Sequence, residues 1–94
     1  MRITGLIWLE DIVQKNLQKH DVRQQEVREL FANRPRYRFV EKGHRADEDV
    51  YAALGRTDAG RYLIVFFIHK IDGRALILSA RDMTDTERRR YGKK

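Results

Sequence analysis

The 94-residue sequence contains no cysteine, so it can form neither a disulfide framework nor a thiolate metal site. A domain of this size without such cross-links depends on the packing of its core, and binding to a partner can add stability. The absence of cysteine fits a cytoplasmic protein, because disulfides are rare in that compartment. We therefore expect a small cytoplasmic domain.

Long hydrophobic runs are also missing. The longest apolar run, residues 62–68, is far shorter than the roughly 20 residues that a membrane-spanning helix needs. The N-terminal segment lacks the long apolar stretch of a signal peptide. No repeat, linker or low-complexity segment interrupts the chain. We expect a single domain over residues 1–94, with residues 62–68 as a buried strand and no association with a membrane.

Acidic residues are in deficit, with 14 Asp and Glu against 20 Lys and Arg, which gives a formal net charge of +6. Such an excess favours binding to polyanions or to an acidic partner protein. The histidines lack the i, i+4 spacing of a helical metal pair, and no acidic cluster resembles a hard-metal loop. A phosphate-binding Gly-rich loop and a serine nucleophile elbow are absent as well. We therefore expect neither a catalytic metal nor a cofactor.

The pattern of apolar residues predicts an α+β domain in the order β-α-α-β-β-β-β-α, with a mainly antiparallel, twisted sheet and helices packed on one face. The strongest turn signal is Asp72-Gly73, between two apolar strands. The predicted strands cover residues 3–9, 37–40, 50–55, 61–70 and 74–81. The predicted helices are residues 11–19, a second helix that ends at residue 32, and a last helix that follows Thr84.

Two sequence patterns predict where helices begin. Asp21 with Gln24 has the form of an N-cap and its reciprocal partner, and Thr84 with Glu87 has the form of a capping box. Pro35 ends the second helix, because proline disfavours helical conformation in the residue before it. The expected core between helices and sheet consists of Trp8, Leu17, Leu30, Phe31 and Phe66.

The last third of the chain groups several chemically useful side chains. A strand that ends in Ser79-Ala80-Arg81 is followed six residues later by Glu87-Arg88-Arg89-Arg90-Tyr91 on a short helix. Basic, acidic and phenolic groups are thus gathered at one strand–helix junction. This grouping suits a site that binds a phosphodiester and moves its protons without a metal.

The chain resembles the BrnT family of toxin ribonucleases along nearly its whole length. The similarity is carried, in order, by Trp8, residues 16–22, Phe31, residues 54–57, Gly60-Arg61, Ser79-Ala80-Arg81, Thr84, Glu87-Arg88 and Tyr91. Two positions differ from the family's usual pattern. Asp21 stands where glycine is usual, and Lys70 stands where many relatives have arginine.

The resemblance implies a RelE-like fold and an endoribonuclease activity that stops translation, with mRNA as the expected substrate. It also implies that a small cognate antitoxin, similar to BrnA and carrying a DNA-binding domain, neutralises the activity.

Arg81 is the first candidate for a catalytic residue, because a guanidinium binds phosphate oxygens with a rigid fork. It is expected to share a strand face with Ser79 and Ile77. A structural alternative is that Arg81 forms an ion pair with Asp82 or Asp85.

His20, Glu87, Arg88 and Tyr91 complete the candidate catalytic set. Imidazole generally titrates near neutral pH, so His20 could transfer a proton, or it could cap the end of the first helix. Glu87 could act in acid–base chemistry or only in the capping box. Arg88 and Tyr91 can share one face of the last helix. The Tyr91 ring could then stack on a base, donate a proton or pack against the sheet.

Four further basic residues are candidates for RNA binding. Lys19 does not share a helix face with His20, so it is either a phosphate contact or a solvated lysine. Lys70 is favoured as an additional basic group at the site. Arg61 begins the same strand at its opposite end and is expected to have a structural or RNA-positioning role. Arg89 lies in the basic last turn of the final helix, where cations favour the helix dipole.

Two other functions remain open on the sequence alone. The chain could be a non-catalytic RNA- or ribosome-binding module of the same fold, in which the arginines contact phosphates and Tyr91 stacks. It could also be a purely protein-binding component whose basic surface holds an acidic antitoxin. A set of proton-transfer groups would distinguish the enzyme from both.

Overall fold

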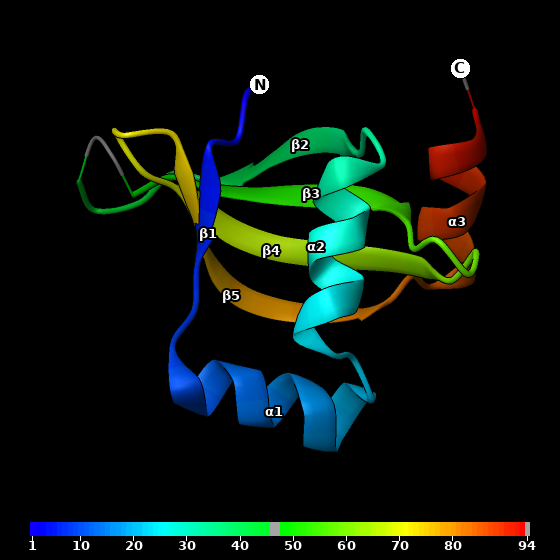
Figure 1. The fold of residues 1–94 in the computed structure, drawn as a ribbon. Coiled ribbons are helices and arrows are strands. Elements are labelled where there is room, and N and C mark those ends of the chain that lie inside the picture. The colour runs from blue at the N-terminus through cyan, green and yellow to red at the C-terminus, as the bar shows by residue number, and fades with distance from the viewer. Residues whose placement is uncertain (46–47, 94) are drawn as a thin grey trace.

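The computed structural model describes residues 1–45 and 48–93, and it confirms the predicted α+β order of elements (Figure 1). The last helix, α3, begins at the predicted Thr84–Glu87 capping box, and Gly73 has the positive φ of 92° that suits a glycine in a turn. The elements are β1 (Gly5–Ile7), α1 (Glu10–His20), α2 (Gln24–Ala32), β2 (Arg36–Glu41), β3 (Val50–Arg56), β4 (Tyr62–His69), β5 (Arg74–Asp82) and α3 (Asp85–Gly92).

The strands form one twisted sheet in the order β1-β5-β4-β3-β2 (Figure 1). β2, β3, β4 and β5 pair antiparallel with their neighbours, while β1 pairs parallel with β5. β4 therefore has a strand on each side, and its two faces are both apolar. This explains why its sequence reads as a continuous hydrophobic run rather than an alternating one.

The two faces of the sheet are covered differently. On one face α1 and α2 pack over a core that includes Leu30, Leu63, Val65, Phe67 and Ile77, as predicted for the first two helices. The opposite face carries a smaller cluster of Ala52, Leu54 and Ile64, against which only Phe66, Met83 and Tyr91 pack among the described residues. α3 contributes Tyr91 to this second cluster, whereas α1 and α2 lie on the other face (Figure 1).

Two residues predicted for the helix-side core lie elsewhere. Leu17 is 42% exposed, because it lies on the side of α1 that faces away from the sheet. Phe66 alternates with Val65 and Phe67 along β4 and so packs in the cluster on the opposite face. Leu30 is fully buried as expected.

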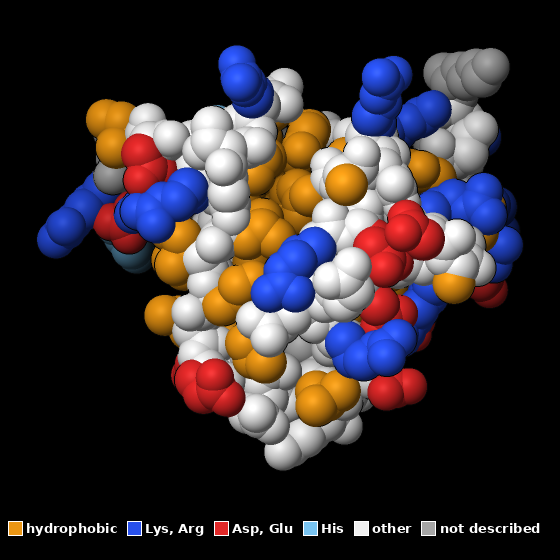
Figure 2. Space-filling model, in the orientation of Figure 1, with side chains coloured by type: hydrophobic (Ala, Val, Ile, Leu, Met, Phe, Trp, Pro, Cys, Tyr) orange, Lys and Arg blue, Asp and Glu red, His pale blue; other side chains and the backbone are white. Residues whose placement is uncertain are grey.

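Apolar side chains also line a shallow hollow between the N-terminal segment and the end of α2 (Figure 2).

A β-bulge changes the faces of β5. Ser79 pairs with Phe66, but Ile77 pairs with Phe67, so the register shifts between the two pairs. Ile77 consequently lies in the helix-side core while Ser79 and Arg81 point to the opposite face. The prediction that Arg81 shares a face with Ser79 is confirmed, and the prediction for Ile77 is wrong.

The link between α1 and α2 also differs from the prediction. Asp21 is not the N-cap of α2; it ends α1 in the left-handed conformation, with φ of 52° and ψ of 40°. Its N–H donates to the Leu17 carbonyl oxygen. The N-cap is Arg23, whose N–H donates to the Glu26 carboxylate at 3.0 Å. A left-handed residue at a helix end is most often glycine, and aspartate is one of the few other residues that visit this conformation.

α1 lies along the edge of β5, since β1 pairs only with residues Arg74 to Leu76. Asn16 is buried, and its Oδ1 accepts a hydrogen bond from the N–H of Ala80 at 3.1 Å. Lys15 donates to the carbonyl oxygen of Leu78 at 3.0 Å. These side chains satisfy backbone groups of β5 and fix the C-terminal end of α1 beside Asp82 and Arg81.

Candidate active site

A cleft of about 590 Å³ lies between the C-terminal end of α1 and the junction of β5 with α3. Four of the residues predicted for the site line it: Lys19 and His20 at the end of α1, Arg61 just before β4, and Arg81 near the end of β5. The other lining residues are Gln18, Asp21, Asp82 and Thr84. The fold thus gathers basic groups from three separate segments around one opening.

Arg81 is held by Glu87 in a two-point ion pair. Nη1 donates to Oε1 at 2.8 Å, and Nη2 donates to Oε2 at 2.9 Å. Nη1 also donates to the carbonyl oxygen of Asp82 at 3.0 Å. The carboxylate partner of Arg81 is therefore Glu87, and the predicted alternative of a pair with Asp82 or Asp85 is wrong.

Glu87 combines this ion pair with its role in the helix cap. Its Oε1 also accepts a hydrogen bond from the N–H of Thr84 at 2.8 Å. The hydrogen bond from Arg81 lowers the pKa of Glu87 to about 2, with a further lowering by Thr84 and an opposing effect of burial. The same bond raises the pKa of Arg81. Glu87 is therefore ionised and doubly bound at neutral pH, which makes it a weak proton acceptor.

Arg81 keeps one edge of its guanidinium available. Of its five N–H groups, three are used in the bonds to Glu87 and Asp82. Within the described part of the chain, no hydrogen bond engages Nε or the second N–H of Nη2. The side chain is 30% exposed and lines the cleft. Two parallel N–H groups on one edge match two oxygens of a phosphate.

Arg61, by contrast, has every N–H group engaged. Nε and Nη2 donate to the two carboxylate oxygens of Asp82 at 2.8 and 3.1 Å. Nη1 donates to Glu26 at 3.1 Å and to the carbonyl oxygen of Asp21 at 2.7 Å, and Nη2 also donates to the carbonyl oxygen of His20 at 3.0 Å. Arg61 thus ties the ends of α1, α2 and β5 together. This geometry favours the structural role over direct RNA binding.

His20 occupies the end of α1, and its position is fixed through its own carbonyl oxygen. The half-buried ring lines the cleft, and no hydrogen bond to that ring occurs within residues 1–45 and 48–93. It lies near Asp82, whose pKa is lowered mainly by the hydrogen bond from Arg61 and, to a smaller extent, by the charge of His20. Among the described residues that line the cleft, His20 is the one with an imidazole ring.

Arg88 and Tyr91 lie outside the cleft, on the sheet face that α3 covers. The Arg88 guanidinium lies 4.0 Å from the centre of the Tyr62 ring, and Arg56 lies 4.8 Å from the same centre. The Tyr91 ring packs edge-on against Tyr62, with centroids 6.0 Å apart. Two arginines and Tyr91 therefore surround the Tyr62 ring beside α3, and the arginines add cation–π attraction.

Two of the predicted RNA-binding residues lie away from the cleft. Lys70 follows the end of β4 where His69 pairs with Ala75, whereas Arg81 pairs with Ile64 toward the other end of the same strand pair. The structure does not bring Lys70 to Arg81. Arg89 is exposed on α3, and its Nη2 donates to Thr86 Oγ1 at 3.4 Å.

Sequence reasoning missed Asp82 and two arginines of β2, Arg36 and Arg38, on the sheet face that α3 contacts. Asp82 positions Arg61 through a contact 21 residues away, which no local pattern predicts. Arg36 and Arg38 could have been found, because alternate residues of a strand share a face. Both line a hollow together with Arg90 of α3.

No three His, Asp or Glu side chains of the described residues gather closely enough to hold a metal ion. In the same part of the chain, every helix is too short or too polar to cross a membrane.

Comparison with known proteins gives one family. A family model described as "Ribonuclease toxin, BrnT, of type II toxin-antitoxin system" matches residues 8–87. The matched range contains α1, the start of α3, and every residue that lines the cleft. No curated protein sequence matches the chain.

Proposed function

The chain belongs to the BrnT family of ribonuclease toxins from type II toxin-antitoxin systems, and we propose that it cleaves RNA in the cleft around Arg81 without a metal ion. The observation that carries this proposal is that Arg81 lines the same cleft as His20, while its Nε and one N–H of Nη2 form no hydrogen bond within the described part of the chain. One group can then bind a phosphate while the other exchanges a proton.

The proposed reaction is an attack by the ribose 2′-oxygen on the adjacent phosphorus. A bond forms between the 2′-oxygen and phosphorus while the bond from phosphorus to the 5′-oxygen breaks. Arg81 stabilises the charge that develops on the non-bridging oxygens, and Lys19 adds a positive charge at the mouth of the cleft. His20 takes the proton of the 2′-hydroxyl, and water in the open cleft supplies a proton to the 5′-oxygen.

Glu87 is assigned a positioning role in this scheme. Its carboxylate, with a pKa of about 2, holds Arg81 by two hydrogen bonds from Nη1 and Nη2 at the border of the cleft. Arg61 and Asp82 position His20 in a similar way, because Arg61 binds both Asp82 and the His20 carbonyl oxygen. Neither Glu87 nor Arg61 needs to contact RNA.

We further propose that cleavage of mRNA in the cytoplasm stops translation and that a cognate, BrnA-like antitoxin with a DNA-binding domain neutralises the protein. The basic groups on α3 and at the cleft suit an acidic surface on that antitoxin. Its binding would block access to Arg81.

A second candidate function is a non-catalytic RNA-binding module. The cluster of Arg88, Tyr62 and Tyr91 favours it, since aromatic rings and arginines bind single-stranded RNA without chemistry.

Induction of the chain alone in cells separates these functions. The proposed ribonuclease stops growth and fragments cellular RNA, and both effects are lost with Arg81→Ala at equal protein level. A binding module would slow growth while leaving RNA intact. A component that only binds a partner protein would do neither.

A further inference from the structure

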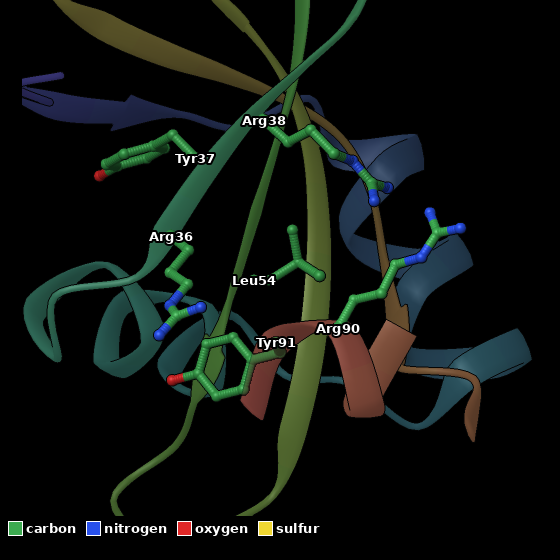
Figure 3. Close-up of a pocket in the computed structure, with 6 residues that line it drawn as sticks. All are labelled: Arg36, Tyr37, Arg38, Leu54, Arg90 and Tyr91. Carbon is green, nitrogen blue, oxygen red and sulfur yellow. The ribbon is translucent and has the colours of Figure 1, made fainter. Parts of the chain in front are cut away.

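A second hollow lies between β2 and α3, on the sheet face that α3 contacts. Its volume is about 290 Å³, and its lining residues are Arg36, Tyr37, Arg38, Leu54, Arg90 and Tyr91 (Figure 3). None of these residues lines the cleft around Arg81. The two features are therefore separate openings on the molecule.

Figure 3 shows how the side chains surround this hollow. Leu54 lies in the middle, with Arg36 and Tyr91 on one side and Arg38 and Arg90 on the other. Leu54 and Tyr91 supply apolar surface, and the Arg36 guanidinium lies 5.5 Å from the centre of the Tyr91 ring. The hollow therefore has an apolar floor, one aromatic wall and a cationic rim.

Tyr37 contributes little to the hollow despite its position. Its ring points away in Figure 3 and packs with Phe31 and Phe67 in the core on the helix side. The relevant groups are thus the three arginines, Leu54 and Tyr91.

Among the described residues, no carboxylate pairs with the arginines of the hollow. In the described part of the chain neither Arg38 nor Arg90 forms an ion pair, and no carboxylate lines the hollow. Arg36 donates to the backbone carbonyl oxygen of Lys93, which carries no net charge. Three exposed cations around an apolar floor suit a ligand that combines negative charge with a flat, hydrophobic part. A nucleotide has both.

The strand register connects this hollow with the cleft. Arg36 pairs with Leu54, Leu54 pairs with Ile64, and Ile64 pairs with Arg81. The two arginines are therefore the ends of one cross-strand row, three strand spacings or roughly 14 Å apart, on the same face of the sheet. Because Met83 and Tyr91 pack against the cluster that contains Leu54 and Ile64, an RNA strand that contacts both arginines runs beside α3 rather than directly over this row.

We propose that the hollow formed by Arg36, Arg38, Leu54, Arg90 and Tyr91 binds a nucleotide of the substrate RNA away from the cleaved bond. This inference rests on the proposed ribonuclease function, whose site it extends. The base lies against Leu54 and Tyr91, and the neighbouring phosphates bind Arg38 and Arg90.

The test is binding of fluorescein-labelled 2′-O-methyl oligonucleotides of adenosine, cytidine or uridine, which cannot be cleaved because the 2′-oxygen is blocked. Fluorescence anisotropy gives the Kd of the parent protein and of the double variant Arg38→Ala/Arg90→Ala for dinucleotides and hexanucleotides. For the best-bound hexanucleotide, the Kd of the double variant should rise about tenfold or more. The dependence of log Kd on log salt should become shallower by about 1.4, since each phosphate contact to a single strand contributes about 0.7.

The matched control removes the same charge elsewhere. Arg2→Ala/Arg28→Ala changes two exposed arginines, at the N-terminus and on α2, and should leave the Kd for the hexanucleotide nearly unchanged. The parent should bind hexanucleotides more tightly than dinucleotides, and the Arg38→Ala/Arg90→Ala variant should lose most of that difference. Circular dichroism checks that both variants are folded.

Three outcomes overturn the inference: an unchanged Kd in the Arg38→Ala/Arg90→Ala variant, an equal loss in the control, or a loss confined to antitoxin binding. The last would make the hollow a protein interface. If RNA is cleaved but the hollow variant binds as the parent does, only the nucleotide site fails. If the hollow binds oligonucleotides but no RNA is cleaved, the nucleotide site stands and the ribonuclease proposal fails.

Discussion

Arg81 and Glu87 face each other across the junction of β5 and α3, joined by hydrogen bonds of 2.8 and 2.9 Å. The pair connects the start of α3 to the sheet, which matters because no residue of α3 is fully buried. It also fixes which edge of Arg81 stays open. One interaction thus contributes both to the stability of the last helix and to the geometry of the cleft.

This pair should make stability depend on acidity. The pKa of Glu87 falls from 4.5 to about 2 on folding, so its contribution is fully present above pH 4.5 and is lost as the pH falls toward 2. We expect Glu87→Gln to lower the free energy of unfolding by on the order of 2 kcal/mol at pH 7, with a smaller difference from the parent at low pH. Urea unfolding from pH 2.5 to 7 measures this difference.

Asp85→Asn is the matched control for Glu87→Gln, because it removes one exposed carboxylate from the same first turn. A parent and Glu87→Gln variant that lose stability in parallel on acidification would contradict the assigned role of the pair.

Arg61 should be a major contributor to stability. Arg61→Lys keeps the charge but cannot form the two-point contact with Asp82 together with the bonds to Glu26 and two carbonyl oxygens. We expect the free energy of unfolding to fall by about 2 kcal/mol, because hydrogen bonds to charged groups contribute about 1.5–3 kcal/mol and Asp82 is partly exposed. The control Arg28→Lys changes an exposed arginine of α2 and should cost less than about 0.5 kcal/mol. Equal and small losses of unfolding free energy in both variants would show that the hydrogen bonds of Arg61 contribute little to stability.

Local patterns in the sequence predict part of this architecture and miss another part for a physical reason. The Thr84–Glu87 cap and the Asp72-Gly73 turn were predictable because each depends on residues close together in the chain. The Arg61 network joins residues 21 to 41 positions apart, and no periodicity encodes it. The prediction of the sheet face on which Ile77 lies was wrong because of the bulge in β5, since an alternation of faces with a period of two assumes regular pairing.

The same limit applies to the candidate site. The gathering of Arg81, Glu87 and a helix at one junction follows from the order of residues, and the structure pairs Arg81 with Glu87. The separation of Arg88 and Tyr91 from the cleft depends on which sheet face α3 covers. That choice is made by packing against Leu54 and Ile64, distant residues whose role a single sequence does not reveal.

His20 should be needed for proton transfer rather than for folding. His20→Gly is expected to reduce kcat by about 100-fold or more, the usual effect of losing a positioned acid or base. Addition of free imidazole should restore part of the activity of this variant, since the ring makes no hydrogen bond that the described structure depends on. Cleavage rates at increasing imidazole concentration test this, with Lys19→Ala as a variant that imidazole should not rescue. A His20→Gly enzyme with parental kcat would exclude the role.

Antitoxin binding should depend on charge and should cover the surface around Arg81, Arg88 and Tyr91. Association is expected to speed up at low salt, because opposite charges steer encounter. Arg88→Glu should slow association by about tenfold, whereas Arg28→Glu on α2 should have little effect. Stopped-flow mixing with the cognate antitoxin measures both rates, and the melting temperature should rise with antitoxin concentration. A complex that blocks cleavage while leaving these three side chains open to solvent would contradict direct occlusion.

The most direct test of the central claim is cleavage of RNA by the purified protein in excess EDTA, with Arg81→Ala and Arg81→Lys beside the parent. We predict that the parent cuts RNA under these conditions and leaves 2′,3′-cyclic or 3′-phosphate ends. The cleavage rate of Arg81→Ala should be lower than that of the parent by about 100-fold or more. Arg81→Lys should recover only part of this rate, because lysine lacks the two parallel N–H groups of a guanidinium. Cleavage that requires added Mg²⁺ and yields 5′-phosphate ends, or a folded Arg81→Ala protein that cuts at the parental rate, would contradict the account.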